Sequence, residues 1–229
     1  MDRRELFTAL GSLGVGVSVE ADHGDKKTDG PARPVAGLHA HFCGIHVAKN
    51  NPKFQMIVQH YCGMQADHLH QCLLFDSSEK NAKLIGIEYI ISDAEYRKLD
   101  DKEKRYWHPH TYEVLAGGLT APDMKPEAEM NFMKALLTTW GKTWHTWPDP
   151  KTAVPEGEPL LIWSLGGDAQ SDDAVVAARD KECGVDTAAI RARRAQEFGL
   201  KVPQIPQPKS MDDLGRQWTA SGDDQPTKT

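Results

Sequence analysis

Histidine is the residue type with the clearest clustering in this chain of 229 residues. Nine of its ten histidines lie between residues 39 and 145. Most of these form close pairs, which are His39 with His41, His68 with His70, and His108 with His110. A neutral imidazole binds divalent metal ions, and its titration near neutral pH also lets it carry protons. The clustering therefore indicates a metal site or acid–base chemistry and does not choose between them.

Two cysteines lie close to histidines at the spacing of a β-strand. Residues i and i+2 share one face of a strand, so His60 would project with Cys62, and His70 with Cys72. Two such strands side by side would bring nitrogen and sulfur ligands together. The alternative is that both cysteines are small core residues, as buried free cysteines usually are. This alternative is stronger for Cys72, which begins the apolar run Cys-Leu-Leu-Phe.

His108 and His110 share a face if the chain is extended there. Pro109 between them cannot donate a backbone hydrogen bond, so we expect an edge strand, a bulge or a loop. Glu113 has the opposite strand parity, and a bend is needed before its carboxylate can approach the two imidazoles. The alternative is that the two histidines cap the C-terminus of a helix and interact with its dipole.

Several function classes lack the motif that they need. The chain has no Gly-x-Ser-x-Gly elbow, phosphate-binding loop, dinucleotide fingerprint or Cys-x-x-Cys pair. The net charge of −6 offers no basic face to a nucleic acid, which we exclude as a partner. No apolar stretch reaches the roughly 20 residues of a transmembrane helix, so we expect no membrane-spanning segment.

The elements that would position the histidines are strands followed by helices. Four segments rich in β-branched and aromatic residues are expected strands, namely 54–62, 70–75, 83–91 and 160–165. Ser92 and Glu95 form a capping box, which opens a helix that runs toward Tyr106. This order of elements predicts an α+β fold, a single domain with a mainly antiparallel sheet flanked by helices.

Three further helices follow. Pro126 opens the first, and Gly141 is expected to end it. Met130, Met133, Leu137 and Trp140 recur along it at helical spacing, as core residues do. Segments 172–183 and 186–198 form the other two, which end at Gly184 and Gly199.

The N-terminal segment is similar to an export signal. Arg3 and Arg4 form a twin-arginine pair, a mildly apolar run follows, and Ala21 ends a small-residue cleavage site. We therefore expect an exported protein, periplasmic or extracellular. The expected boundaries are a signal peptide over 1–21, a linker over 22–36, a folded domain over 37–200 and a Pro-containing polar tail over 201–229.

The chain resembles the oil-body-associated protein family over roughly residues 38 to 165. The segments that carry the resemblance are His60-Tyr-Cys62, Gln71 through Ser77, Ala82 through Ser92, Trp107-His-Pro-His110 with Tyr112-Glu-Val114, and Gly141-Lys-Thr143 with His145 and Trp147. The resemblance implies a domain of unknown molecular function, a lipid-droplet-associated role in plants, and in this chain a bacterial, exported relative. A peripheral lipid surface is therefore a possible partner.

The resemblance also distinguishes stronger from weaker candidate ligands among the histidines. The family pattern matches His41, Gly44, His46, His60, Cys62, Gln71, Cys72, Glu88, Tyr89, His108, His110, Glu113, Lys142 and His145. The chain departs from the pattern at Cys43, His68 and His70, which weakens the last two as ligands. The better ligand set is then His46, His60, His108, His110 and Glu113.

We expect this set to bind one divalent metal ion of the zinc or copper type, with Glu113 as a ligand or general base. Two other classes stay open. One is a non-enzymatic lipid-surface or structural protein whose histidines form a buried network. The other is a metal-dependent oxidase or hydrolase of unknown small-molecule substrate, with Glu113, Lys142 or His145 carrying protons.

Cys43 and Cys183 are extra to the family pattern. In an oxidising compartment they could form a disulfide that ties the C-terminal helices to the start of the domain.

Overall fold

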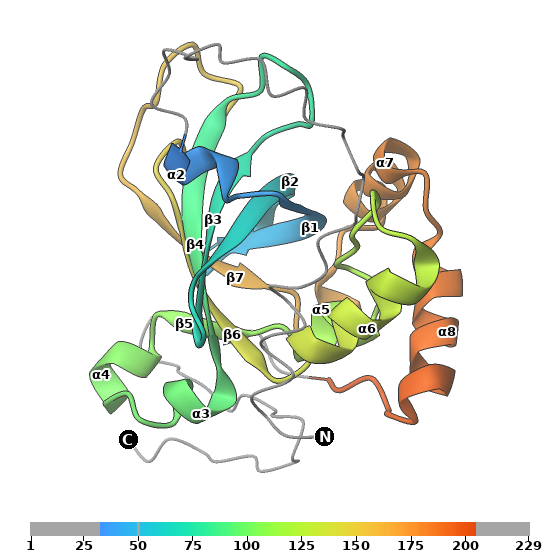
Figure 1. Ribbon diagram of the computed structural model, residues 1–229. Coiled ribbons are helices and arrows are strands. Elements are labelled where there is room, and N and C mark those ends of the chain that lie inside the picture. Colours follow the sequence, from blue (N-terminus) through green and yellow to red (C-terminus); the bar gives the residue numbers. More distant parts are fainter. Residues whose placement is uncertain (1–32, 50, 205–229) are drawn as a thin grey trace, which may run out of the picture.

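The computed structural model describes residues 33–49 and 51–204 (Figure 1). Its strands are β1 (Ala40–Ala48), β2 (Asn51–Ala66), β3 (Leu69–Phe75), β4 (Leu84–Ser92), β5 (Trp107–Pro109), β6 (Thr139–His145) and β7 (Leu160–Ser164). Its helices are α2 (Arg33–Ala36), α3 (Asp93–Tyr96), α4 (Asp101–Lys104), α5 (Thr111–Leu115), α6 (Pro126–Leu136), α7 (Asp173–Cys183) and α8 (Thr187–Phe198), with a 3₁₀ turn at Asp168–Gln170.

The sheet closes into a barrel. Its strands follow one another in the order β4-β3-β2-β1-β7-β6, and β6 pairs back onto β4, with every pairing antiparallel. The sheet was expected to be antiparallel and flanked by helices, and both expectations are confirmed. Its closure into a barrel is additional, because the sequence pattern does not tell an open sheet from a closed one.

Strand β6 is the seam of the barrel. One of its edges pairs with β4 along its whole length, from Gly86 opposite His145 to Ser92 opposite Thr139. The other edge is divided, because residues 140–142 pair with β5 and residues 143–145 pair with β7. The Ser164 hydroxyl of β7 donates to the Pro109 carbonyl of β5 at 3.0 Å. The short strand β5 therefore lies on an edge, as Pro109 requires.

Helix α6 packs against the barrel interior at one end. The ring of Phe132 stacks on that of Phe42 with centroids 4.7 Å apart, and Met133 is fully buried in the same core. The expectation that Met130, Met133 and Leu137 pack in the core is therefore confirmed. The helix ends at Leu136, however, and residues 139–145 form β6.

The expected helix end at Gly141 is wrong for a physical reason. Residues 139–145 alternate Thr, Gly, Thr and His with Trp, Lys and Trp, which is the period of a strand, and β4 pairs with all of them. The expected helix from Ser92 toward Tyr106 is also broken into α3 and α4. Ser92 caps α3 as predicted, since its hydroxyl accepts from the Glu95 amide at 3.2 Å, and Asp100 then caps α4.

Two buried arginines fix the C-terminal helices to the end of α5 and to the segment that follows it. Arg179 of α7 donates to the Gly117 carbonyl at 2.7 Å. Arg194 of α8 donates to the carbonyls of Val114 and Leu119 at 2.6 and 2.9 Å. Helices α7 and α8 begin and end as predicted, with Asp172 and Asp186 as N-caps and Gly184 and Gly199 in left-handed C-caps.

The disulfide bond does not join the expected pair of cysteines. Cys62 and Cys72 are opposite one another on β2 and β3 and are bridged, whereas Cys43 and Cys183 are free. The expected Cys43–Cys183 bridge is therefore wrong for this structure. Cross-strand neighbours inside a barrel are close enough to bridge, and periodicity alone did not show that β2 and β3 pair in this register.

The expected signal peptide over 1–21, most of the expected linker over 22–36 and most of the expected tail over 201–229 lie outside the described residues. Residues 33–36 of the linker form α2. Across residues 33–49 and 51–204, no helix combines the length and apolar character that crossing a bilayer requires.

The disulfide gives a first prediction. Replacing Cys62 and Cys72 together by Ala should lower the free energy of unfolding by about 2–3 kcal/mol, because the bridge closes a short loop in the unfolded chain. Thermal melts in non-reducing buffer measure the change. The matched control is Cys183→Ala, which removes a free thiol and should change the melting temperature little. Equal melting temperatures for the double variant and the control would show that the bridge does not stabilise the fold.

Candidate metal centre

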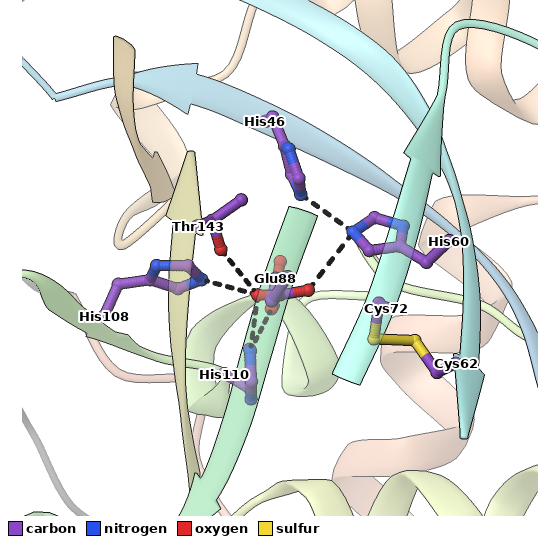
Figure 2. The surroundings of a disulfide bond; sticks show 9 residues. His46, His60, Cys62, Cys72, Glu88, His108, His110 and Thr143 are labelled. Carbon is purple, nitrogen blue, oxygen red and sulfur yellow. Dashed lines mark hydrogen bonds and ion pairs between the residues drawn. A yellow bond between two sulfur atoms is a disulfide. The ribbon is translucent and has the colours of Figure 1, made fainter. Parts of the chain in front are cut away.

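Four histidines and one glutamate meet inside the barrel (Figure 2). We call them the His/Glu cluster, which consists of His46, His60, Glu88, His108 and His110. Each of these residues is at most 4 % exposed. The cluster lies among core residues, so its polar atoms must bind one another, neighbouring buried polar groups or a ligand.

Each member comes from a different part of the fold. His46, His60 and Glu88 project inward from β1, β2 and β4, because the barrel turns alternate residues of each strand to the inside. His108 lies in the middle of β5. His110 precedes α5 in a helical conformation, and this is the bend that sequence reasoning required after Pro109. The alternative that His108 and His110 cap a helix C-terminus is wrong, because His110 stands at the N-terminus of α5.

Glu88 is the centre of the cluster. Its Oε1 lies 3.5 Å from Nε2 of both His108 and His110, and its Oε2 lies 3.5 Å from Nε2 of His60. These separations exceed the 2.7–2.9 Å typical of a charge-assisted hydrogen bond. They match the distance between two ligand atoms that bind the same ion, each at roughly 2.0–2.1 Å from it. Two groups of three ligand atoms, one with His46 and His60 and one with His108 and His110, share Glu88.

Gly141 of β6 leaves the space that the cluster surrounds. A Cβ atom placed there would lie 2.3 Å from Glu88 Oε1, 2.7 Å from His110 Nε2 and 2.8 Å from His108 Nε2. Every other amino acid would push a side chain into these three ligand atoms. The missing side chain thus keeps open a small volume within coordination reach of a carboxylate and two imidazoles.

Neighbouring hydroxyls and a further histidine orient the cluster. Thr143 donates to Glu88 Oε1 at 2.8 Å, and Thr139 Oγ1 lies 2.7 Å from His110 Nδ1. His46 joins His60 through their Nε2 atoms at 2.8 Å, and its Nδ1 meets His145 Nε2 at 2.9 Å. Metal-binding histidines in proteins usually have a partner on the second ring nitrogen, and Thr139 is that partner for His110.

Burial sets the protonation of most of these groups. It lowers the pKa of His46 and His60, and it lowers the pKa of His108 and His145 to about 3. Neutral imidazoles, the form that binds metals, therefore prevail at neutral pH. For Glu88, burial acts to raise the pKa, but the hydrogen bond from His110 and the nearby imidazoles outweigh it and hold the pKa well below its usual range. Glu88 is a carboxylate.

The pKa values of His110 and Glu113 are raised, in contrast to those of the other buried groups. Burial acts to lower the pKa of His110, but its hydrogen bond to Glu88 and the nearby Glu113 raise it overall. Burial raises the pKa of Glu113 to about 8. Glu113 Oε1 lies 3.9 Å from His110 Nε2 on the first turn of α5. It is thus a neutral carboxylic acid beside the cluster at neutral pH.

The other expected site residues lie apart. Lys142 of β6 has the opposite parity to Gly141 and Thr143, and its ammonium group binds Glu103 at 2.6 Å on the outer side of the barrel. His145 contacts the cluster only through His46. His41 faces outward, between Asp123 at 2.6 Å and Gln59 at 2.8 Å.

Glu88 is the functional residue that sequence reasoning missed. It was matched to the family pattern and placed in a buried strand, but it was given no chemical role. The signal was present, because Glu88 is the one charged residue among the apolar positions of segment 84–91. A charge in a buried strand must be paired or bind a cation, since burying it alone is costly.

Comparisons with known proteins agree on one family. The model of DUF1264, described as a protein of unknown function, matches residues 32–197. Oil body-associated protein 1B of Arabidopsis thaliana is 31 % identical over 74 % of this chain and 70 % of its own length. Oil body-associated protein 1A of Zea mays is 32 % identical over 72 % of this chain and 70 % of its own length. No solved structure matches the chain.

The buried histidines give a second prediction, for metal-free protein. The unfolded chain binds protons at histidines with a pKa near 6.5, whereas folded His46, His60, His108 and His145 stay neutral. Stability should therefore fall as the pH drops below about 6.5, by roughly 1.4 kcal/mol per pH unit for each such histidine, with the raised pKa of Glu113 offsetting one of them. Thermal melts between pH 7.5 and pH 5 in chelator measure this slope.

His145→Gln should make the slope shallower by about one histidine, and the exposed His39→Gln should leave it unchanged. A melting temperature that does not depend on pH in this window would contradict neutral, buried histidines.

Proposed function

We propose a function from the site itself, because the chain belongs to the DUF1264 family, which is described only as proteins of unknown function. In our proposal the protein binds one divalent metal ion of the zinc or copper type inside the barrel. The observation that carries the proposal is the convergence of Glu88, His108 and His110 on the space above Gly141. Imidazole and carboxylate donors without thiolate suit zinc, copper and related divalent ions.

The distances favour an ion over a buried hydrogen-bonded network. Imidazoles that held Glu88 through strong hydrogen bonds alone would stand at a length like that of the His46–His60 contact, 2.8 Å. Three imidazole nitrogens instead stand 3.5 Å from the carboxylate oxygens. We therefore assign the ion to Glu88, His108 and His110, and we assign His60, which His46 contacts, to the other carboxylate oxygen.

The residues around the cluster suit proton transfer as well as binding. A bound divalent ion would act as a Lewis acid and would lower the pKa of a bound water. Glu113 is a buried acid 3.9 Å from His110 and can exchange a proton near neutral pH. Contacts join His60 to His46 and His46 to His145, and they extend the histidine network beyond the carboxylate. These observations favour a metal-dependent enzyme as the second candidate function.

Association with a lipid surface rests on the relatives' names. The large hydrophobic residues that are exposed in the described part of the chain are Val35, Met64, Leu84, Tyr89 and Val154. They are spread over α2, β2, β4 and the loop before β7, and only β4 carries two of them. No described helix joins a long apolar face to a basic one. Export likewise stays a prediction, because it depends on residues outside the described part of the chain.

Metal content is the third prediction. Protein purified without a His-tag and reconstituted with zinc or copper should hold one ion per chain by elemental analysis. Removing the ion should lower the melting temperature, because an ion present at 100–1,000 times its dissociation constant stabilises the fold by about 3–4 kcal/mol. Glu88→Gln and His108→Ala should each abolish stoichiometric binding.

The matched controls are His39→Ala and His68→Ala, which should retain the ion. Wild-type protein that takes up no stoichiometric zinc or copper would overturn the proposal and leave the buried histidine network in its place. Glu113→Gln separates the roles of that residue, since retained metal points to an acid–base group and lost metal points to a ligand.

Gly141 provides the fourth prediction. Gly141→Ala should abolish metal binding while the circular dichroism spectrum stays that of the wild type, because the new methyl group occupies the space between Glu88, His108 and His110. Gly118→Ala is the control, since a Cβ atom there meets only ordinary contacts of 3.4 Å and more. Full metal content in Gly141→Ala would show that the ion binds elsewhere.

A further inference from the structure

An apolar cavity of about 270 Å³ lies next to the His/Glu cluster. Inward residues of four strands line it, among them Ala40, Cys62, His70 and Ile90, and helix α6 adds Phe132 and Leu136. None of the lining residues is Lys, Arg, Asp or Glu. The hydroxyl of Thr139, one of its few polar groups, already contacts the Leu136 carbonyl at 2.8 Å.

The cavity runs from the surface toward the cluster. At its outer end it is lined by Gly37, His39 and Met64, which are exposed. At its inner end it shares Phe42, Cys62, Ile90 and Leu136 with a second, smaller cavity. That inner cavity is lined by His46, His60, Glu88, His110 and Glu113. A molecule in the outer cavity therefore lies mostly against apolar side chains, with His39, His70 and Thr139 as the polar ones, until it reaches the cluster.

We propose that this cavity binds the hydrocarbon chain of a small amphiphile, with its one polar end group directed at the His/Glu cluster. The volume is just below the roughly 300–1,000 Å³ of pockets that enclose drug-sized ligands, so a single medium-length chain fits it. The uncharged wall excludes a second charged group, because nothing along it would replace the lost hydration. The end group is a hydroxyl or a carboxylate, since imidazoles and a carboxylic acid offer it hydrogen bonds and a bound metal ion would offer it a ligand position.

The direction of the end group rests on the proposed metal site, but the binding of the ligand's hydrocarbon chain does not. A neutral alcohol tests the apolar wall without metal. A carboxylate of the same length tests the metal in addition, because the anion is poorly tolerated beside Glu88 unless a cation is present. The two series together separate failure of the cavity from failure of the metal site.

The experiment is calorimetric titration of the full chain with n-alkanols and n-alkanoates of six to ten carbons, with and without zinc. In the alkanol series, each added methylene should tighten binding about three- to fourfold in both forms of the protein, until the cavity is full. Zinc should tighten alkanoate binding at least tenfold and alkanol binding much less. Ala40→Phe, which fills the cavity from β1, should weaken both series at least tenfold, and Ala40→Leu should weaken them less.

Ala153→Phe is the control, because residue 153 is exposed and does not line the cavity. The circular dichroism spectrum checks that the Ala40 variants fold. Binding without chain-length dependence, or binding that Ala40→Phe leaves intact in a folded protein, would overturn the proposal. Alkanols that bind with the expected dependence to a protein that takes up no zinc would support the cavity and reject the metal site. Suppose that the zinc-free protein and a protein shown to carry zinc bind alkanoates with equal affinity. That result would overturn the assigned direction of the end group.

Discussion

The pairing of β6 with β4 determines the rest of the structure. It closes the barrel, and its register sets Glu88 opposite Thr143 and places Gly141 within reach of the carboxylate. A carboxylate in a closed interior would cost several kcal/mol if it had no partner. The imidazoles brought by β2, β5 and the start of α5 supply those partners, so closing the barrel and assembling the cluster are one event.

The divided edge of β6 also explains how residues 107–115 contribute to the His/Glu cluster. Because β7 pairs with only half of the free edge of β6, β5 has room on the other half and carries His108 inward. The bend at His110 then turns α5 across the barrel and brings Glu113 beside the cluster. Arg179 and Arg194 bind backbone carbonyls of the residues that follow α5, and thus the C-terminal helices fix a segment that has little regular structure of its own.

The interior of the barrel divides into two chemical zones. One zone holds the ionised Glu88 and neutral imidazoles, and the other is an apolar cavity between the strands and α6. A low-dielectric wall next to a charged group strengthens every electrostatic interaction of that group. The same burial that keeps His108 and His145 neutral therefore also holds Glu113 protonated, and it makes the site sensitive to any charge that enters it.

The sequence by itself determined the elements whose signals are local. Alternation and β-branched residues predicted β2, β3, β4 and β7, and capping residues and terminal glycines predicted α7 and α8, because these signals act within a few residues. The histidine clustering was also visible in the sequence, but it was the resemblance to the family that selected His46, His60, His108 and His110, which the fold gathers. Only the tertiary structure decided the closure of the barrel, the Cys62–Cys72 bridge and the central place of Glu88. Each of these depends on which strands become neighbours and in which register, and the energy of those pairings comes from residues far apart along the chain.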